Sequence, residues 1–339
     1  MENKQKLYVY YPTTDSYGIM VIIERFVEAC KKNGIDCVFI TNLDGRSVTD
    51  QIIPYSTPLE LINKGFETKL NLMVDAYSYG NLNKIKFYLN KGLFFTYDFA
   101  YSVYAYFRAV YEEKRICSKY DNVMLVSRED INYLKRLTKK TPNFLCVPNG
   151  VEITDVKPKT KSGKLRLGIL SSWASKVSYQ ENDWFIRSYY KRYAKEHPDV
   201  ELHIAGRGDY GKRYIDMPQV KYIGSVNDLN DFFCDIDIFL AVNPKGCGIL
   251  NRVLDAFAHK TIVVGYEKCF SGFRDMKNSY MSFDDYYSFV SSIDYIKTHA
   301  METEEIIDNA YSQMQILYNW DKNYDQFISR VKYIFNFVD

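Results

Sequence analysis

Residues 246–258 read GCGILNRVLDAFA and follow the apolar run Ile236–Val242 in a chain of 339 residues. The order of features is a strand, a loop with two glycines and the start of a helix. Glycines let backbone N–H groups come close to a ligand, and the helix dipole favours an anion at the helix N-terminus. The segment therefore predicts a βα unit with an anion-binding loop at the carboxyl end of its strand.

Two side chains at the start of this helix indicate a nucleotide. Arg252 can donate a fork of hydrogen bonds to a diphosphate. Asp255 lies one turn further along and can accept two hydrogen bonds from a ribose diol. Together they describe a nucleoside diphosphate site, although an ordinary surface ion pair between the two residues would have the same spacing.

Strands and helices alternate on both sides of this segment. In the second half, apolar runs predict strands at Leu165–Leu170, Glu201–Ala205, Val220–Ile223, Ile236–Val242 and Thr261–Gly265. In the first half, they predict strands at Leu7–Tyr11, Cys37–Thr41, Leu70–Val74, Leu93–Thr96, Val123–Val126 and Phe144–Val147. This alternation indicates an α/β fold with mostly parallel sheets that are covered by helices on both faces.

The alternation is interrupted once, near the middle of the chain. The turn Pro148-Asn149-Gly150 is followed by a charged stretch, KPKTKSGK, at residues 157–164. We therefore expect two doubly wound, Rossmann-like domains that face one cleft, where a ligand belongs. The predicted parts are an N-terminal domain (1–150), a linker (151–164), a C-terminal domain (165–318) and a C-terminal helix (319–339) that packs back toward the first domain.

Composition excludes several classes of protein. Apolar residues make up 47% and charged residues 25%, which excludes wholesale disorder, and the net charge of +2 creates no field for nucleic acid. No signal peptide and no apolar run long enough to span a membrane are recognised, so at most peripheral membrane contact is expected. Seven cysteines without a CxxC pair indicate reduced thiols in the cytoplasm and no structural zinc.

Residues 246–265 (GCGILNRVLDAFAHKTIVVG) resemble the donor-site segment of retaining GT-B glycosyltransferases of family 4, also called glycosyl transferases group 1. Shorter segments resemble other markers of the family in the same order. They are Leu125–Ser127 (LVS), Val147–Val151 (VPNGV), Leu202–Gly208 (LHIAGRG), Val220–Leu229 (VKYIGSVNDL) and Asn319–Asp321 (NWD).

The resemblance implies an enzyme that moves a sugar from a nucleoside diphosphate-sugar to a hydroxyl of a carbohydrate or lipid-linked acceptor. It implies retention at the anomeric carbon, no metal and no other cofactor, and it favours UDP as the donor nucleotide. A role in surface polysaccharide or glycoconjugate synthesis is expected, with a cytoplasmic location that includes the inner face of the membrane. The donor-binding positions that it implies in this segment are Gly248, Ile249, Asn251, Arg252 and Asp255.

Two further donor-binding residues are predicted outside this segment. Lys176 is the nearest basic residue after the first strand of the C-terminal domain, although it could equally be a solvated loop lysine. Gly18 stands in the first βα loop. Two positions depart from the family pattern, because Asp255 replaces a Glu and Cys247 replaces the Glu that contacts the donor sugar.

The resembling family often places a histidine, or a pair like His-Asp, after the fourth strand, facing the reacting carbon. This half of the chain has no histidine, and the stretch that we match to this position is Phe94–Asp98. Asp98 is therefore the predicted catalytic partner of Arg252, since it could receive the acceptor's proton. An alternative is that Asp98 is the N-cap of the helix Phe99–Tyr111.

Three other patterns are interpreted as structural. Asp235-Ile236-Asp237 has the D-x-D spacing of metal-dependent sugar transferases but opens an apolar strand. The aromatic segment Phe99–Tyr111 is expected to pack on the sheet, although acceptor stacking or membrane contact would also use it. The basic run Lys135–Lys140 is expected to be a solvated helix end.

Two competing functions are considered. A catalytically silent GT-B subunit that stabilises a partner glycosyltransferase would explain Cys247 and the missing histidine. A Rossmann oxidoreductase is disfavoured because no glycine fingerprint follows the first strand.

Overall fold

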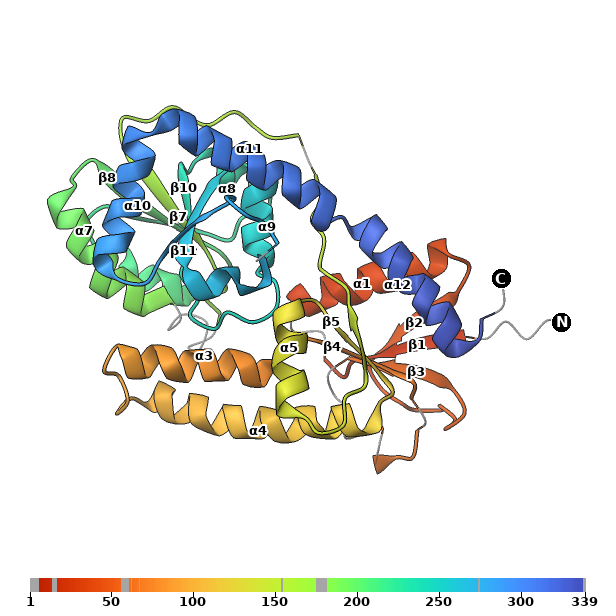
Figure 1. The fold of residues 1–339 in the computed structure, drawn as a ribbon. Helices are drawn as coiled ribbons and strands as arrows, with labels where there is room; N and C mark the ends of the chain where they lie inside the picture. The colour runs from red at the N-terminus through yellow and green to blue at the C-terminus, as the bar shows by residue number, and fades with distance from the viewer. Residues whose placement is uncertain are drawn as a thin grey trace. The chain divides into compact units, whose positions relative to one another are not determined.

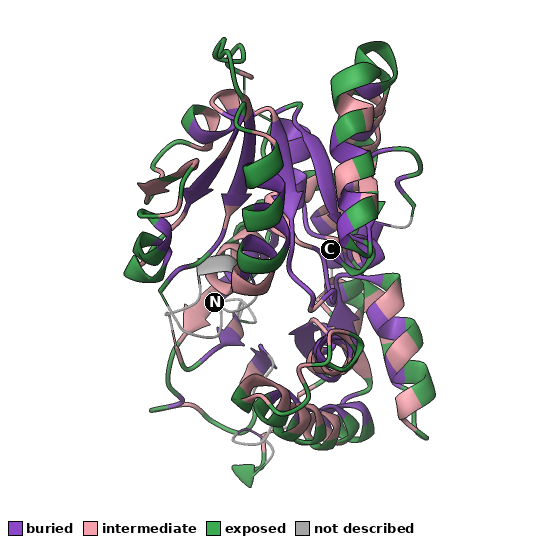
Figure 2. Cartoon of the chain, turned by 90° about the vertical axis from the view of Figure 1, so that its left-hand side faces the viewer, coloured by how far each residue is buried: buried purple, intermediate pink, exposed green. Residues whose placement is uncertain are grey.

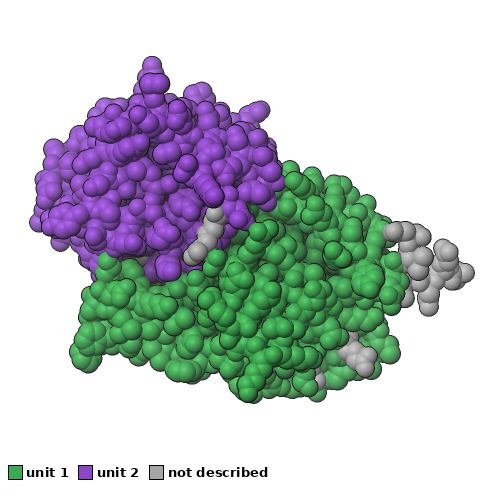
Figure 3. Space-filling model, in the orientation of Figure 1, with its two compact units in different colours: residues 1–150, 247–249, 318–339 green, residues 151–246, 250–317 purple. Residues whose placement is uncertain are grey.

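The computed structural model describes residues 6–13, 17–55, 61, 63–66, 68–153, 155–174, 182–273 and 275–337. The chain divides into two compact units (Figure 3). Unit 1 comprises residues 1–150, 247–249 and 318–339, and unit 2 comprises residues 151–246 and 250–317. The first division falls at Gly150, the residue at which the sequence predicts the N-terminal domain to end.

Unit 2 contains one parallel sheet of six strands in the order β12-β11-β10-β7-β8-β9. The strands are β7 (Leu165–Leu170), β8 (Val200–Ala205), β9 (Val220–Gly224), β10 (Ile238–Ala241), β11 (Ile262–Tyr266) and β12 (Met281–Phe283). The helices are η1 (Ile186–Tyr190), α7 (Lys191–Glu196), η2 (Asp209–Tyr214), α8 (Leu229–Cys234), α9 (Asn251–Ala258), η3 (Glu267–Phe273), α10 (Tyr286–Thr298) and α11 (Ala300–Leu317).

The apolar runs explain why the central strands lie inside. Every residue of β10 and β11 is buried. Figure 2 shows buried strands between helices whose outer sides are exposed. Strands buried on both faces are typical of parallel sheets covered by helices. The predicted α/β class with doubly wound domains is confirmed.

Unit 1 contains two three-stranded parallel sheets, β2-β1-β3 and β4-β5-β6, which a bridge between Tyr55 and Leu72 joins. The strands are β1 (Lys6–Tyr10), β2 (Asp36–Ile40), β3 (Gln51–Pro54), β4 (Leu70–Val74), β5 (Asn122–Leu125) and β6 (Asn143–Cys146). The helices, labelled in Figure 1, are α1 (Tyr17–Lys32), α3 (Tyr77–Asn90), α4 (Tyr97–Lys119), α5 (Arg128–Leu137) and α12 (Trp320–Phe335).

Helix α12 belongs to unit 1 although unit 2 precedes it in the sequence. Its N-cap Asn319 accepts a hydrogen bond from the Lys322 N–H, and Phe327 packs against Phe26 of α1 with 5.5 Å between ring centroids. Trp320 lies against Gly150 so closely that a Cβ at position 150 would overlap the indole ring. A side chain at position 150 would therefore clash with the first residue of α12.

One strand prediction in unit 1 is wrong, and one strand of this unit was not predicted. Residues 93–96 form no strand: they are the turn between α3 and α4, and Phe94 and Phe95 are exposed there. Conversely, Gln51–Pro54 is the strand β3, which was not predicted because it is short and ends in proline. As a result, the fourth strand of the chain is β4, which ends at Val74.

The prediction for the aromatic segment Phe99–Tyr111 is also wrong. This part of α4 packs on α3, and its neighbour in Figure 1 is α3 along most of its length. Only the last turns of α4, with Ile116 and Cys117, join the core cluster beside β5 and α5. The outward side of the segment exposes large aromatic side chains.

Candidate functional site

The carboxyl ends of the strands in unit 2 bring together the predicted donor residues of α9 and the loop after β7. Arg252 Nη1 donates to Ser171 Oγ over 3.1 Å, and Asn182 Nδ2 donates to the same oxygen over 2.9 Å. Ser171 follows β7 directly and is buried. The guanidinium is thus held at the carboxyl edge of the sheet, the edge at which doubly wound domains bind ligands.

Asp255 lies one turn beyond Arg252 on α9 and is partly buried. Burial raises the pKa of its carboxyl to about 7, and the positive charge of Arg252 opposes the shift. Its backbone carbonyl accepts from the His259 backbone N–H over 3.0 Å, which closes the helix.

Glycines let the loops after β7 and β8 pack backbone to backbone. A Cβ at Gly206, which has a φ of +129°, would overlap the Ser171 carbonyl, and one at Gly208 would overlap the backbone of Trp173 and Ala174. The indole N–H of the fully buried Trp173 donates to the Ala205 carbonyl over 2.8 Å. The glycines of the GRG sequence thus position the Ser171 loop.

The loop before α9 packs against η3. Gly246 adopts a φ of +49°, a Cβ there would overlap the Lys268 carbonyl, and Ser271 Oγ donates to the Gly246 carbonyl over 2.9 Å. Cys247 follows and is buried. These contacts fix the glycine loop in one conformation.

Gly248 belongs to unit 1, and two aspartates surround it there. Its N–H donates to Asp130 Oδ2 over 3.0 Å, and a Cβ at this position, which has a φ of +64°, would overlap the Asp75 carboxylate. The backbone amide that the sequence predicts to bind a diphosphate thus contacts a carboxylate in this structure. Only glycine fits here, because both the space and the left-handed backbone exclude a side chain.

Asp130 is fully buried at the start of α5, and the backbone N–H of Ala76 also donates to its Oδ2, over 3.3 Å. Burial and the nearby charge of Asp75 raise its pKa well above the ordinary value. Its second oxygen, Oδ1, accepts no hydrogen bond from the described residues. Asp75 and Asp130 therefore form a carboxylate pair beside Gly248.

A third carboxylate, Glu113 of α4, lies behind this pair. It accepts from the Ser78 N–H over 2.9 Å and from the Ser78 hydroxyl, which satisfies the N-terminus of α3, where Ala76 provides no side-chain cap. Burial raises the pKa of Glu113 to about 7, although the hydrogen bonds from Ser78 oppose the shift.

Replacement of Glu113 tests this capping role. We expect Glu113→Ala to lower the free energy of unfolding by about 2 kcal/mol, because the buried Ser78 groups lose their acceptor. Glu112→Ala, which removes an exposed partner of Arg108, is the matched control and should cost less than about 1 kcal/mol. Equal losses in urea denaturation for the two variants would contradict the capping role.

Glu113→Gln tests how much the ionisation of Glu113 contributes to the pH dependence of the free energy of unfolding. Between pH 4.5 and about 7 the folded protein keeps a proton on Glu113 that the unfolded chain has released, so this residue makes stability fall as pH rises. The glutamine variant lacks the effect, and its stability relative to wild type should therefore increase across this range.

Most of the predicted donor residues lie on or beside α9. Ile249 is buried, Asn251 begins the helix, and Gly18 lies in the first turn of α1. Lys176 lies outside the described residues. These placements leave the donor-binding roles as predictions.

The prediction for Asp98 depended on a strand that does not exist. Asp98 lies in the first turn of α4 after the 93–96 turn, and the N-cap of that helix is Thr96, so the alternative N-cap interpretation is wrong. The residue that follows the fourth strand is Asp75, which lies against Gly248. The sequence analysis missed Asp75, although an aspartate directly after the apolar run Leu70–Val74 was a visible signal.

The aspartates of the D-x-D pattern in unit 2 hold a buried arginine. Arg166 of β7 pairs with Asp235 over 2.8 Å and with Asp237 over 3.4 Å, and it also donates to the Thr160 carbonyl. The structural interpretation of this pattern is confirmed.

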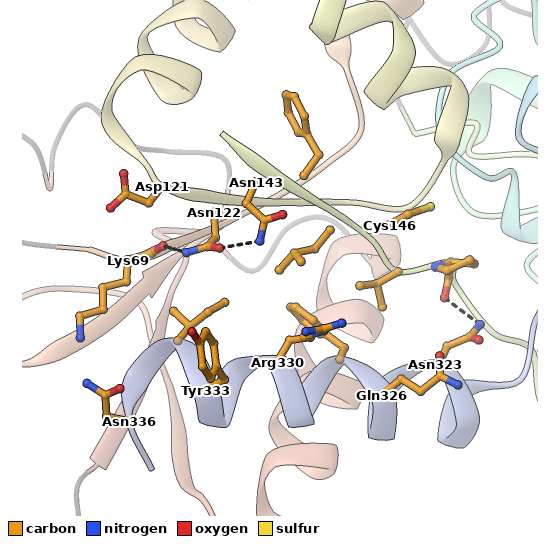
Figure 4. Close-up of a pocket in the computed structure, with 16 residues that line it drawn as sticks. Lys69, Asp121, Asn122, Asn143, Cys146, Asn323, Gln326, Arg330, Tyr333 and Asn336 are labelled. Atoms are coloured by element: carbon orange, nitrogen blue, oxygen red, sulfur yellow. Dashed lines mark hydrogen bonds between the residues drawn. The ribbon is translucent and has the colours of Figure 1, made fainter. Parts of the chain in front are cut away.

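A separate hollow of about 820 Å³ lies in unit 1 between the edge strand β6 and α12 (Figure 4). Arg330 and Tyr333 of α12 point toward the strands, where Asn122 and Asn143 are hydrogen-bonded over 3.0 Å. None of the predicted site residues lines it.

Comparisons with known proteins agree with this architecture. The model of the family "Glycosyl transferases group 1" matches residues 166–293, which include the Ser171 loop, Arg252 and Asp255. No curated protein sequence matches the chain.

Three solved structures share the fold over nearly their whole length. Sucrose-phosphate synthase from Thermosynechococcus elongatus is 13% identical with a TM-score of 0.73, and the alignment covers 98% of this chain and 99% of that one. Anabaena HepE in complex with UDP and glucose is 11% identical with a TM-score of 0.67, at 97% and 100% coverage. Trehalose-6-phosphate synthase OtsA is 11% identical with a TM-score of 0.66, at 96% and 99% coverage.

These structures share two Rossmann-like domains, and the family match lies on the unit that contains Arg252 and Asp255. The chain therefore has the GT-B fold, and its second unit carries a glycosyl transferases group 1 domain over residues 166–293.

Proposed function

We propose that the protein transfers a sugar from a UDP-sugar to a hydroxyl acceptor, with retention of configuration and without a metal. The observation that carries this proposal is the Arg252–Ser171 contact at the carboxyl edge of the sheet, with Asp255 one turn away on the same helix. HepE, whose structure holds UDP and glucose, supports the choice of UDP.

In this proposal Arg252 binds the diphosphate of the donor and stabilises the negative charge that grows as the sugar leaves. The N-terminus of α9 adds its dipole to the same anion. Asp255 accepts hydrogen bonds from the ribose hydroxyls, which requires its ionised form for both bonds. No metal is needed because the arginine and the helix supply the positive charge.

Asp75 replaces Asp98 as the proposed polar group near the reacting carbon. It follows the fourth strand, where the resembling family often has a histidine or a pair like His-Asp, and it contacts Gly248. The pKa of the nearby Asp130 carboxyl is raised well above its ordinary value, in part by the charge of Asp75. Ionisation of one carboxyl therefore disfavours ionisation of the other.

We further propose a carbohydrate or lipid-linked acceptor, a role in polysaccharide or glycoconjugate synthesis and a cytoplasmic location. Seven free thiols support a reducing compartment. Among the described residues, no helix is both long and apolar enough to cross a membrane.

A thermal-shift series with UDP, GDP, ADP, CMP and NAD tests the donor class. UDP should raise the unfolding midpoint by several degrees at about 100 times its dissociation constant, equally with EDTA and with magnesium. A shift only with magnesium would contradict metal independence, and a shift with another nucleotide would replace UDP.

Asp255 gives the binding a pH dependence. The affinity for UDP-glucose should fall as pH drops from 8 to 6, because the Asp255 carboxyl gains a proton near pH 7 while the diphosphate diester does not titrate there. Asp255→Asn should bind more weakly and without this dependence. Calorimetry at three pH values measures both, and a wild-type affinity that is constant with pH would contradict the ribose role.

A catalytically silent subunit is the second candidate. The hydrogen bond from Gly248 to Asp130 favours it, because this amide is the one that the resembling family uses for the diphosphate. This candidate predicts no thermal shift with any nucleotide and a stable complex with another glycosyltransferase.

A further inference from the structure

Helix α4 presents an exposed aromatic face for which the fold provides no cover. Phe95, immediately before the helix, is 92% exposed, and Tyr97 and Phe107 are 74% and 65% exposed. Tyr101, Tyr104 and Tyr111 are exposed on the same side. The spacing of 97, 101, 104, 107–108 and 111 follows the helical repeat, so the rings form one continuous stripe.

The opposite side of the helix explains why the stripe faces outward. Ser102, Ala109, Glu113 and Ile116 are the buried positions, and they face α3 and the core. Glu113 caps α3 from this side, which fixes the rotation of α4 about its axis. The aromatic side chains therefore face away from α3 because the small and capping residues occupy the packed side.

The same stripe continues into positive charge toward the C-terminus of the helix. Arg108, Lys114, Arg115 and Lys119 lie on or beside it, and Lys140 Nζ donates to the Ser118 carbonyl over 3.1 Å, which brings the end of the basic run 135–140 to this point. Arg108 pairs with Glu112, while Lys114 and Lys119 have no carboxylate partner among the described residues.

We propose that α4 docks unit 1 on the surface of an anionic lipid bilayer. Tyrosine and phenylalanine side chains on an amphipathic helix lie at the boundary of headgroups and acyl chains, and unpaired lysines bind lipid phosphates. We call the aromatic and basic residues of α4 together the docking face. This inference does not rest on the proposed transfer reaction.

Shape and charge favour a bilayer over a second copy of the chain. The docking face is the convex side of a single helix, which a soft surface covers more completely than a rigid one. Two copies that met with their α4 helices parallel would oppose their unpaired lysines, and like charges without a counter-ion repel. An anionic bilayer complements both the charge and the aromatic stripe.

Vesicle flotation of the full chain tests the proposal. We expect binding to vesicles of phosphatidylcholine and phosphatidylglycerol in a 7:3 ratio at about 0.1 M salt, roughly tenfold weaker at high salt because exposed charges are screened. Binding to phosphatidylcholine alone should be weaker still. Absence of binding to the anionic vesicles at low salt would overturn the proposal.

Two double variants separate the parts of the docking face. Tyr104→Ser with Phe107→Ser and Lys114→Gln with Lys119→Gln should each reduce binding about tenfold, with unchanged thermal midpoints because all four side chains are exposed. The matched controls are Tyr333→Ser and Lys322→Gln, which lie on α12 and should bind like wild type.

Two further results would overturn the proposal. One is equal binding by the aromatic variant and the Tyr333 control. The other is concentration-dependent dimerisation in gel filtration that Phe107→Ser abolishes, because the docking face would then be an interface between copies of the chain.

Discussion

Arg252→Ala is expected to lower turnover about 100-fold. A preorganised donor that stabilises charge in the transition state contributes this much in enzymes where one has been removed. In the proposed reaction Arg252 is such a donor: it donates to Ser171 Oγ over 3.1 Å, and Asn182 donates to the same oxygen. The measurement is UDP release from UDP-glucose with a hydroxyl acceptor.

The control and the conservative variant make this result specific. Arg192→Ala removes an exposed guanidinium that stacks on Tyr286 at 3.9 Å, elsewhere in unit 2, and should keep the wild-type rate. Arg252→Lys should recover only part of the activity, since an ammonium cannot donate the fork that a diphosphate accepts. Near-normal turnover of Arg252→Ala would remove Arg252 from the mechanism.

The second large effect concerns stability. Arg166→Met should lower the free energy of unfolding by roughly 3 kcal/mol, because it removes the buried cation that Asp235 and Asp237 share, although Asp235 keeps Lys221 at 3.5 Å. The Arg166 side chain is only 4% exposed, while those of Asp235 and Asp237 are 28% and 34% exposed. Urea denaturation followed by circular dichroism measures the loss.

A neighbouring pair serves as the control. Lys164→Met removes an exposed ion pair with Glu201, just before β7, and should cost less than about 1 kcal/mol. Combining Arg166→Met with Asp235→Asn and Asp237→Asn should recover part of the stability, because neither carboxylate is then left without the Arg166 guanidinium. A triple variant as unstable as Arg166→Met alone would show that the lost packing, and not the charge, causes the effect.

The sequence was most informative about fold where apolar runs are buried on both faces. The strands around Leu165–Leu170 and Ile262–Tyr266 are uninterrupted and bounded by turns, so their prediction required no tertiary information. The run at residues 93–96 is also mostly apolar, yet its phenylalanines are exposed. An apolar residue in a sequence does not reveal whether it is covered, because burial depends on which elements pack above it.

For the candidate site, local spacing was a better guide than the order of elements. Arg252 and Asp255 could be found from the glycine loop and one helical turn, which involve only neighbouring residues. Asp98 was chosen by counting strands, and one false strand moved the choice away from Asp75. The carboxylate pair with Asp130 could not be predicted, since 54 residues separate Ala76 from the aspartate that it contacts.

The contact of Trp320 with Gly150 has a consequence for biosynthesis. The ribosome makes residues 151–317 between the two parts of unit 1 that meet there. At about 5–20 residues per second, this takes on the order of 10–30 s, during which the nascent first unit lacks α12 and the surface beneath it is uncovered. Unit 2 can therefore fold before unit 1 is complete, and chaperones have most to protect during this interval.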